Sequence, residues 1–261
     1  MLFLLVACKE TGKGKSEPAS TSDWALVWGD EFDKDGLPDT TKWSYNTGGH
    51  GWGNQELQYY TANRPENARI ENGHLIIEAR KEPWQGSQYT SARMVSEGKG
   101  EWQYGRIEVK AKIPSGLGTW PAIWMLGAND PLEWPDDGEL DIMEHVGHNQ
   151  GYVHGTIHCK KFNHVIGTQK TDTIYVPDCS TAFHIYSINW DKDSVRVAMD
   201  DSTYFRFANE HSGYDAWPFD NKMYLLLNIA VGGSWGGQKG VDSTIFPKRM
   251  EIDYVRVYQK K

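Results

Sequence analysis

The interpretation of this chain starts from one stretch, Asp137-Gly138-Glu139-Leu140-Asp141-Ile142-Met143-Glu144-His145. In a β-strand successive side chains alternate between the two faces, so Glu139 and Asp141 share one face and the apolar residues between them point to the other. Strict alternation leaves Glu144 on the apolar face. A β-bulge near Ile142 and Met143 adds one residue and returns Glu144 to the acidic face. The stretch therefore predicts a bulged strand with three acids in a row.

A row of three acids is unfavourable for stability, because neighbouring carboxylates repel each other and one of them tends to stay protonated. Acid/base catalysis needs this division between an ionised and a protonated carboxyl group. Asp141 lies between the two glutamates and can share a proton with either, so the three titrate as a coupled set. The alternatives are a solvated acidic strand edge and a cation site built from the same oxygens.

The chain around this stretch has the sequence pattern of a β-sandwich. Short alternating runs bounded by Gly, Asn, Asp and Pro begin at Trp24 and continue to the end of the chain. The run 223–230 is apolar on both faces and predicts a central strand. Runs of period two also predict strands over 107–113 and 195–199, and Asp200-Asp201 after the second of them predicts a hairpin turn. A last strand is predicted over 251–258, where Glu251, Asp253, Val255 and Val257 alternate with Ile252, Tyr254 and Tyr258.

Composition agrees with one all-β domain. The chain has 261 residues with 27 Gly and 12 Trp, and it shows no long helical pattern, second domain or internal repeat. A single sandwich of this size is ordinary. The net charge of −8 argues against a nucleic-acid partner, which would select a basic surface. An uncharged polysaccharide does not need a charged surface to attract it.

The hexapeptide 139–144 resembles the catalytic signature of glycoside hydrolase family 16, in the bulged form found in its laminarinase-like members. Six further stretches match that family in order: Trp28–Phe32, Asn54–Tyr60, Gly105–Glu108, Gly118–Met125, His154–His158 and Val231–Gly236. The resemblance runs from about Trp24 to Tyr258. It implies a catalytic domain over 23–261 with a jelly-roll, concanavalin A-like β-sandwich fold, in which two curved antiparallel sheets carry a substrate cleft across the concave face.

The resemblance also implies roles for the three acids. Glu139 is expected to be the nucleophile, Asp141 the assisting carboxylate and Glu144 the general acid/base of a retaining endo-glycosidase, which needs no cofactor for catalysis. The implied substrate is β-1,3-glucan, with an agarase-like or mixed-linkage glucan hydrolase as the alternative. A non-catalytic glucan-binding lectin on the same fold is the alternative of another class. The presence of all three acids disfavours it.

Aromatic residues are candidates for sugar binding. Trp120 and Trp124 are four apart, so on one strand they point the same way and can form a platform with spare indole N–H groups for sugar hydroxyls. Trp235, in a glycine-rich loop, is expected to be exposed and to extend this platform. The alternative for each of these indoles is core packing.

Polar candidates come from the same resemblance. Asn54 and Arg93 match positions that contact sugars on the non-reducing side of the cut, and His158 is expected near the cleaved bond. Their alternatives are a turn asparagine, a surface arginine and a structural histidine. A zinc site on His154 and His158 is disfavoured, because on one strand the pair is about 13 Å apart.

Two structural sites are also expected. By resemblance, Glu31, the backbone carbonyl of Gly73 and Asp253 hold a structural calcium ion on the convex face, with three unrelated surface groups as the alternative. Cys159 and Cys179 form an even pair for an oxidising compartment. A disulfide between them closes a loop of about 20 residues and contributes ~3 kcal/mol, while two buried free thiols are the alternative.

The N-terminus predicts export. Residues 1–7 read as a truncated lipoprotein signal peptide, and Leu5-Val6-Ala7-Cys8 matches a lipobox with Cys8 as the lipidation site; a clipped ordinary secretory signal is the alternative. Residues 8–22 are interpreted as a flexible tether, because no aliphatic side chain larger than Ala occurs from Lys9 to Ser22. We expect an extracytoplasmic bacterial lipoprotein on the outer membrane, cell surface or periplasm, monomeric, in contact with the membrane only through its lipid.

Overall fold

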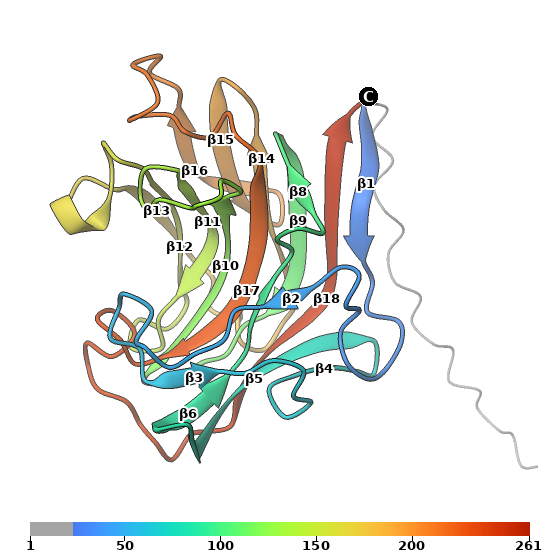
Figure 1. Ribbon diagram of the computed structural model, residues 1–261, viewed down its shortest axis with the longest axis vertical. Helices are drawn as coiled ribbons and strands as arrows, with labels where there is room; N and C mark the ends of the chain where they lie inside the picture. Colours follow the sequence, from blue (N-terminus) through green and yellow to red (C-terminus); the bar gives the residue numbers. More distant parts are fainter. Residues whose placement is uncertain (1–22) are drawn as a thin grey trace, which may run out of the picture.

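The computed structural model describes residues 23–261, and these form two packed sheets (Figure 1). The first sheet has ten strands. Its main path is β16 (Ser202–Ala208), β15 (Ser194–Met199), β14 (His184–Trp190), β9 (Gly105–Lys112), β18 (Lys248–Lys260), β5 (His74–Trp84), β6 (Ser87–Ser91) and β3 (Gln58–Tyr60), with β1 (Trp24–Asp30) paired to β18 and β4 (Ala68–Glu71) paired to β5.

The second sheet has eight strands and carries the acidic stretch. Its path is β13 (Lys170–Tyr175), β12 (Tyr152–His158), β11 (Glu139–His145), β10 (Thr119–Gly127), β17 (Met223–Val231), β7 (Arg93–Val95) and β2 (Ser44–Tyr45), with β8 (Glu101–Trp102) also paired to β17. All strand pairs are antiparallel except β3 with β6. Within residues 23–261 the only helix is the single 3-10 turn η1 (His164–Ile166), so the predicted all-β jelly roll is confirmed.

The core lies between the two sheets. Every residue of β17 is buried, as expected for a central strand. Ile107 and Val255 of the ten-stranded sheet belong to one continuous cluster with Ile123 and Leu225 of the eight-stranded sheet. Full burial of such a side chain contributes about 1.5–3 kcal/mol to the free energy of unfolding. This packing fixes the sheet on which the acids stand.

The final strand differs from its prediction. Strict alternation over 251–258 would place Glu251 and Val255 on one face. The pairing of β18 with β9 shifts between Ile252 and Tyr254, so an irregularity at Asp253 interrupts the alternation. Ile252 and Val255 therefore both reach the core. A bulge of this kind adds one residue to the strand, so the side chains after it point to the opposite face from the one that strict alternation predicts.

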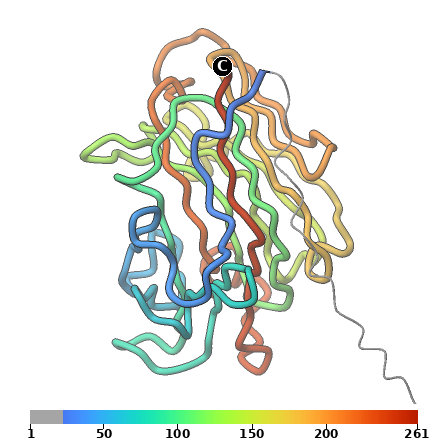
Figure 2. The backbone as a smooth tube through the Cα atoms, turned by 90° about the vertical axis from the view of Figure 1, so that its right-hand side faces the viewer, coloured from blue at the N-terminus to red at the C-terminus, as the bar shows by residue number. Residues whose placement is uncertain are grey.

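The ends of the described chain meet. β1 runs antiparallel beside β18, Trp24 pairs with Lys260, and the backbone N–H of Lys261 donates to the carbonyl of Asp23 at 3.1 Å (Figures 1 and 2). The signal peptide, Cys8 and the tether predicted for residues 1–22 lie outside the described residues. No helix in the described part of the chain is long and apolar enough to cross a bilayer.

Candidate active site

The acidic strand β11 carries the predicted bulge. On the neighbouring strand β10 the successive residues Ile123 and Trp124 pair with Met143 and Asp141, so Ile142 has no partner there. The pairing with β12 shifts in the same interval. One extra residue therefore separates the first two acids from the third, and Glu144 returns to their face.

Both residues of the bulge point into the core. The side chains of Ile142 and Met143 are fully buried. The hydroxyl of Tyr204, on β16 of the other sheet, donates to the backbone carbonyl of Ile142 at 3.0 Å and satisfies a group that the interrupted ladder would leave unpaired. Tyr204 was not among the predicted site residues, because its contact crosses from one sheet to the other.

A cleft of about 870 Å³ opens above this strand. Its walls come from β7, β10, β11, β12 and β17 and from loops that include residues 50–56, 132–134 and 234–238. The structure brings all nine predicted catalytic and substrate-binding residues to its lining: Glu139, Asp141, Glu144, Trp120, Trp124, Asn54, Arg93, His158 and Trp235.

Burial raises the pKa of the Glu139 carboxyl group, and neighbouring groups oppose part of that shift. The indole N–H of Trp134 donates to Oε2 at 2.7 Å and is one of these opposing groups. His164, Arg93 and a hydrogen bond from Asp141 act in the same direction as Trp134. Trp134 was not among the predicted site residues, although it stands only five residues before Glu139 in a Pro- and Asp-rich loop.

Asp141 and Glu144 are surrounded by groups that favour their protonated forms. Burial, and then the charges of Glu139 and Glu144, hold the pKa of Asp141 well above its usual range. Burial and the charge of Glu139 raise the pKa of Glu144 to about 8, against a hydrogen bond from Trp120 Nε1 to Glu144 Oε1 at 3.0 Å. Four neighbouring groups therefore oppose the effect of burial at Glu139 and only one does so at Glu144, which assigns Glu144 as the proton donor of the pair that acid/base chemistry requires.

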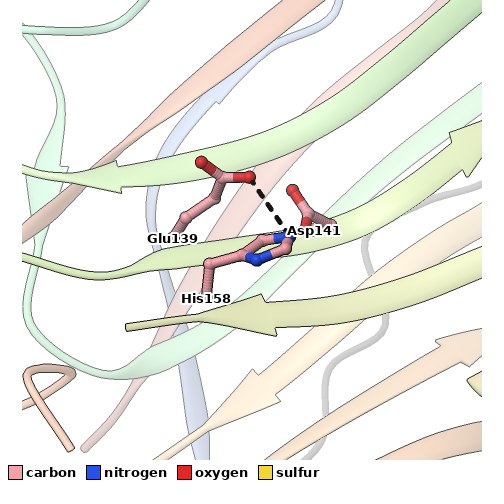
Figure 3. A group of neighbouring side chains, drawn as sticks. All are labelled: Glu139, Asp141 and His158. Atoms are coloured by element: carbon pink, nitrogen blue, oxygen red, sulfur yellow. Dashed lines mark ion pairs between the residues drawn. The ribbon is translucent and has the colours of Figure 1, made fainter. Parts of the chain in front are cut away.

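His158 lies beside the first two acids (Figure 3). Its Nε2 is 3.7 Å from Glu139 Oε1 and 3.6 Å from Asp141 Oδ2, both longer than a hydrogen bond. Burial lowers the pKa of its imidazole to about 4, so the ring is neutral at neutral pH. His158 is thus a polar neighbour of the acids without a compensating charge.

The two platform indoles differ from expectation in one respect. Trp120 and Trp124 both line the cleft, but neither keeps its N–H for a sugar hydroxyl: Trp120 donates to Glu144, and Trp124 Nε1 donates to Asn228 Oδ1 at 2.7 Å. Trp235 is half-buried rather than exposed, because it packs edge-on against Trp120 and His154. The indole faces and edges remain as the sugar-contacting surfaces.

Arg93 is held between two indoles. Its guanidinium lies 4.7 Å from the ring centroid of Trp52 and 4.7 Å from that of Trp124, an arrangement stabilised by cation–π attraction. Trp52 was not predicted, although its position between two glycines before Asn54 marks an unusual backbone. Its φ of +51° is in the left-handed region, and such strain concentrates at functional sites.

Asn54 leads into a polar network at the same end of the cleft. Its Nδ2 lies 3.4 Å from Glu56 Oε1, while Gln58 Nε2 and the Tyr60 hydroxyl donate to Glu56 Oε2 at 2.6 and 3.2 Å. The Tyr60 hydroxyl also accepts from Asn228 Nδ2 at 3.0 Å. Burial raises the pKa of Glu56, the fourth carboxyl group in the cleft, and the hydrogen bonds to its oxygens oppose the shift.

The bulged acid strand, its cleft and its indoles can be compared with known proteins. Residues 55–256 match the model of the glycosyl hydrolases family 16. The chain belongs to this family. It is 54% identical to a beta-glucanase of Rhodothermus marinus over 99% of this chain and 93% of that protein. It is 36% identical to a glucan endo-1,3-beta-glucosidase of Cryptopygus antarcticus, over 89% of this chain and 91% of that protein.

Solved structures of family 16 enzymes agree with the fold. The laminarinase of Rhodothermus marinus superposes with a TM-score of 0.90 at 55% identity, covering 91% of this chain and 98% of that one. A mutant of a non-specific endo-beta-1,3(4)-glucanase, co-crystallised with a glucose oligosaccharide, superposes with a TM-score of 0.89 at 49% identity, covering 96% and 100%. These likenesses span the whole described domain.

The predicted calcium ligands of this family 16 domain come together, but their carboxylates are engaged. Glu31 follows β1, Gly73 lies in the turn between β4 and β5, and Asp253 lies on β18, which pairs with β1 and β5. Arg256 binds both oxygens of Glu31 at 2.8 and 3.0 Å, and Lys110 Nζ is 2.9 Å from Asp253 Oδ2. An ion held by Glu31, the Gly73 carbonyl and Asp253 would have to compete with Arg256 for Glu31 and with Lys110 for Asp253.

The predicted Cys159–Cys179 disulfide is wrong in this structure: both thiols are free and buried. Cys159 follows the end of β12, whereas Cys179 follows the end of β13, and the two strands are antiparallel. The cysteines therefore lie near opposite ends of a strand pair of about 20 Å, far beyond the Cα separation of about 7 Å that a disulfide tolerates. Nearness in sequence was a poor guide to nearness in space.

The hydrogen bond between Trp120 and Glu144 leads to a prediction about the pH dependence of activity. Trp120→Phe removes the N–H that stabilises the Glu144 carboxylate, so the pKa of Glu144 should rise above about 8. Because Glu144 must be protonated to act as an acid, the alkaline limb of the kcat/KM profile should move up by about 0.5–1 pH unit, the equivalent of one hydrogen bond. Trp124→Phe is the matched control, since its N–H serves Asn228. An unmoved or lowered limb in Trp120→Phe would contradict the assignment.

Proposed function

We propose that this protein is an endo-1,3-β-glucanase of the laminarinase type that hydrolyses its substrate with retention of anomeric configuration. The observation that carries the proposal is the bulged strand β11, which places Glu139, held by the Trp134 indole, and Glu144, whose pKa is raised to about 8, on one wall of the cleft. A relative named as a glucan endo-1,3-beta-glucosidase and a solved structure named as a laminarinase match about nine-tenths of the chain and support the choice of substrate.

The first chemical step forms a glycosyl-enzyme. A Glu139 oxygen attacks the anomeric carbon while Glu144 transfers its proton to the departing glucosyl oxygen, so the C–O bond to the leaving sugar breaks as the C–O bond to Glu139 forms. Trp134 holds the second oxygen of Glu139 and thereby orients the first. The proton on Asp141 stabilises the Glu139 carboxylate before attack.

The second step releases the enzyme. Glu144, now ionised, takes a proton from water, and the hydroxide oxygen attacks the anomeric carbon from the face that the leaving sugar vacated. The bond to Glu139 breaks and the carboxylate is restored. Two inversions give net retention. The roles of Trp120, Trp124, Asn54, Arg93, His158 and Trp235 in this proposal are to bind and orient the glucan chain.

A direct test is product analysis with the full chain on laminarin, mixed-linkage β-glucan and agarose in parallel. We expect short β-1,3-linked oligosaccharides from laminarin, with newly formed reducing ends in the β configuration when observed by NMR early in the reaction. Cleavage of agarose with laminarin left intact would overturn the substrate class. Binding of laminarin without any cleavage would instead favour the lectin alternative.

A second candidate, cleavage of mixed-linkage glucan, is favoured by one observation. The relative that superposes with a TM-score of 0.89 is named as a non-specific endo-beta-1,3(4)-glucanase. The same parallel assay separates the two activities. A ratio of kcat/KM for laminarin over mixed-linkage glucan near one would indicate the broader specificity.

We also propose a structural calcium ion at Glu31, Gly73 and Asp253, supported by the convergence of their three segments. An ion that binds only the folded state at about 100 times its Kd adds about 2.7 kcal/mol to the free energy of unfolding, which corresponds to a rise in Tm of about 5–10 °C. Calcium should therefore raise Tm and EDTA should lower it. Asp253→Asn should abolish the difference, and an equal Tm in calcium and EDTA would refute the site.

Finally, we propose that the enzyme is a monomeric lipoprotein anchored outside the cytoplasm through Cys8. The lipobox and the polar tether in residues 1–22 support this location. Cys8→Ser expressed with the native leader should move the protein from the membrane fraction to the soluble fraction. Retention in the membrane fraction would speak against the lipid anchor.

A further inference from the structure

The acids Glu139 and Asp141 and the imidazole of His158 form a group with the composition of a transition-metal site (Figure 3). One ligand atom from each residue lies within 4.8 Å of the other two, and no other group of three His, Cys, Asp or Glu residues in the described part of the chain meets this condition. The zinc site weighed from the sequence paired His158 with His154, whereas in the structure the neighbours of His158 are Glu139 and Asp141.

The distances within the group match a tetrahedral ion. His158 Nε2 lies 3.7 Å from Glu139 Oε1 and 3.6 Å from Asp141 Oδ2. In a tetrahedral zinc site with bonds of about 2.0–2.2 Å, neighbouring ligand atoms are separated by about 3.3–3.6 Å. These contacts are too long for hydrogen bonds, but they suit atoms that bind the same cation from three sides.

The ligand atoms are also oriented by their surroundings. Asp141 is 2% exposed at its side chain, and its Oδ2 has no hydrogen-bond partner in the structure. Trp134 holds Oε2 of Glu139, which leaves Oε1 turned toward His158. Partners of this kind fix the orientation of metal ligands in known sites. All three residues line the cleft, so water can reach an ion bound between them.

We propose that Glu139, Asp141 and His158 form an inhibitory site for a divalent transition cation of borderline softness, for which Zn²⁺ is the probe. Mixed carboxylate and imidazole ligands in a tetrahedral arrangement suit Zn²⁺ better than Ca²⁺ or Mg²⁺, which require six or more oxygen ligands. A bound ion occupies the oxygens of the nucleophile and of its neighbour. Zinc and glucan therefore exclude each other.

Isothermal titration of the full-length protein with Zn²⁺ at neutral pH, with no substrate present, tests the site independently of the proposed activity. His158→Gln and the nearly isosteric Asp141→Asn should each weaken zinc binding by at least about tenfold. His154→Gln is the matched control, because His154 lies on the same strand and lines the same cleft without belonging to the group. A Tm measurement on each variant confirms that it is folded.

Two further readouts decide the outcome. Co²⁺ should give the absorption of a four-coordinate ion in the wild type, and this signal should disappear in His158→Gln. A β-1,3-glucan oligosaccharide at saturation should weaken Zn²⁺ binding by at least about tenfold. Equal zinc affinity in the wild type and both ligand variants, or zinc binding that is indifferent to the oligosaccharide, would overturn the site.

Discussion

Replacing Glu139 with alanine is expected to lower kcat on laminarin by about 10⁴-fold or more while leaving the protein folded. The loss removes the atom that forms the covalent bond, and no neighbouring group replaces it: the pKa of Asp141 is held well above its usual range by burial, and Glu144 must deliver a proton. Initial-rate assays on laminarin measure the effect. The side chain supports no core packing, because it lies in the cleft, so Tm should change little.

Rescue of the Glu139→Ala variant by a small anion, azide, distinguishes loss of the nucleophile from general damage to the cleft. In Glu139→Ala, azide should enter the vacated space and attack the anomeric carbon of an activated aryl β-glucoside substrate, giving a glycosyl azide of inverted, α configuration. Glu139→Gln fills the same space and is the matched control that azide should not rescue. A β-glycosyl azide from Glu139→Ala would show that the nucleophile lies elsewhere.

Replacing Glu144 with alanine is expected to lower kcat/KM on laminarin by about 10²–10⁴-fold, the range that general acid catalysis contributes. A glucosyl oxygen is a poor leaving group and requires the proton that Glu144 donates. A dinitrophenyl glycoside leaves without such help, so its glycosylation step should lose far less. Comparison of the two substrates on the same variant measures the difference.

The two glutamate variants should respond to azide in opposite ways. In Glu144→Ala, azide attacks the glycosyl-enzyme formed on Glu139 and gives a product of retained, β configuration. The alkaline limb of the pH profile assigned to Glu144 should also disappear for the activated substrate, because the pKa of about 8 belongs to the missing group. Equal losses on both substrates would contradict the acid/base role.

The fold and the acid row could be predicted because they depend on local periodicity. Three acids at positions 139, 141 and 144 can share one strand face only through a bulge, and the structure has that bulge between Asp141 and Glu144. The hairpin at Asp200-Asp201 and the buried strand β17 were predicted for the same reason. The resemblance to a family supplied the jelly-roll architecture and the position of the cleft, which periodicity does not.

The remaining features depend on tertiary contacts that periodicity does not encode. Trp134 reaches Glu139 through an irregular loop, and Trp52 reaches Arg93 from a segment far away in sequence. The disulfide prediction failed because antiparallel pairing sends Cys159 and Cys179 to opposite strand ends. Sequence separation constrains such contacts weakly, so they need the assembled sheets.

The meeting of the chain ends has a consequence for engineering. Asp23 and Lys261 leave the domain at one point, joined by a backbone hydrogen bond of 3.1 Å, on the sheet that does not carry the cleft. Domains whose ends adjoin tolerate insertion into host loops and circular permutation, because a short linker closes the ring without strain. This domain can therefore be grafted as a cassette into a carrier protein through a single point of attachment.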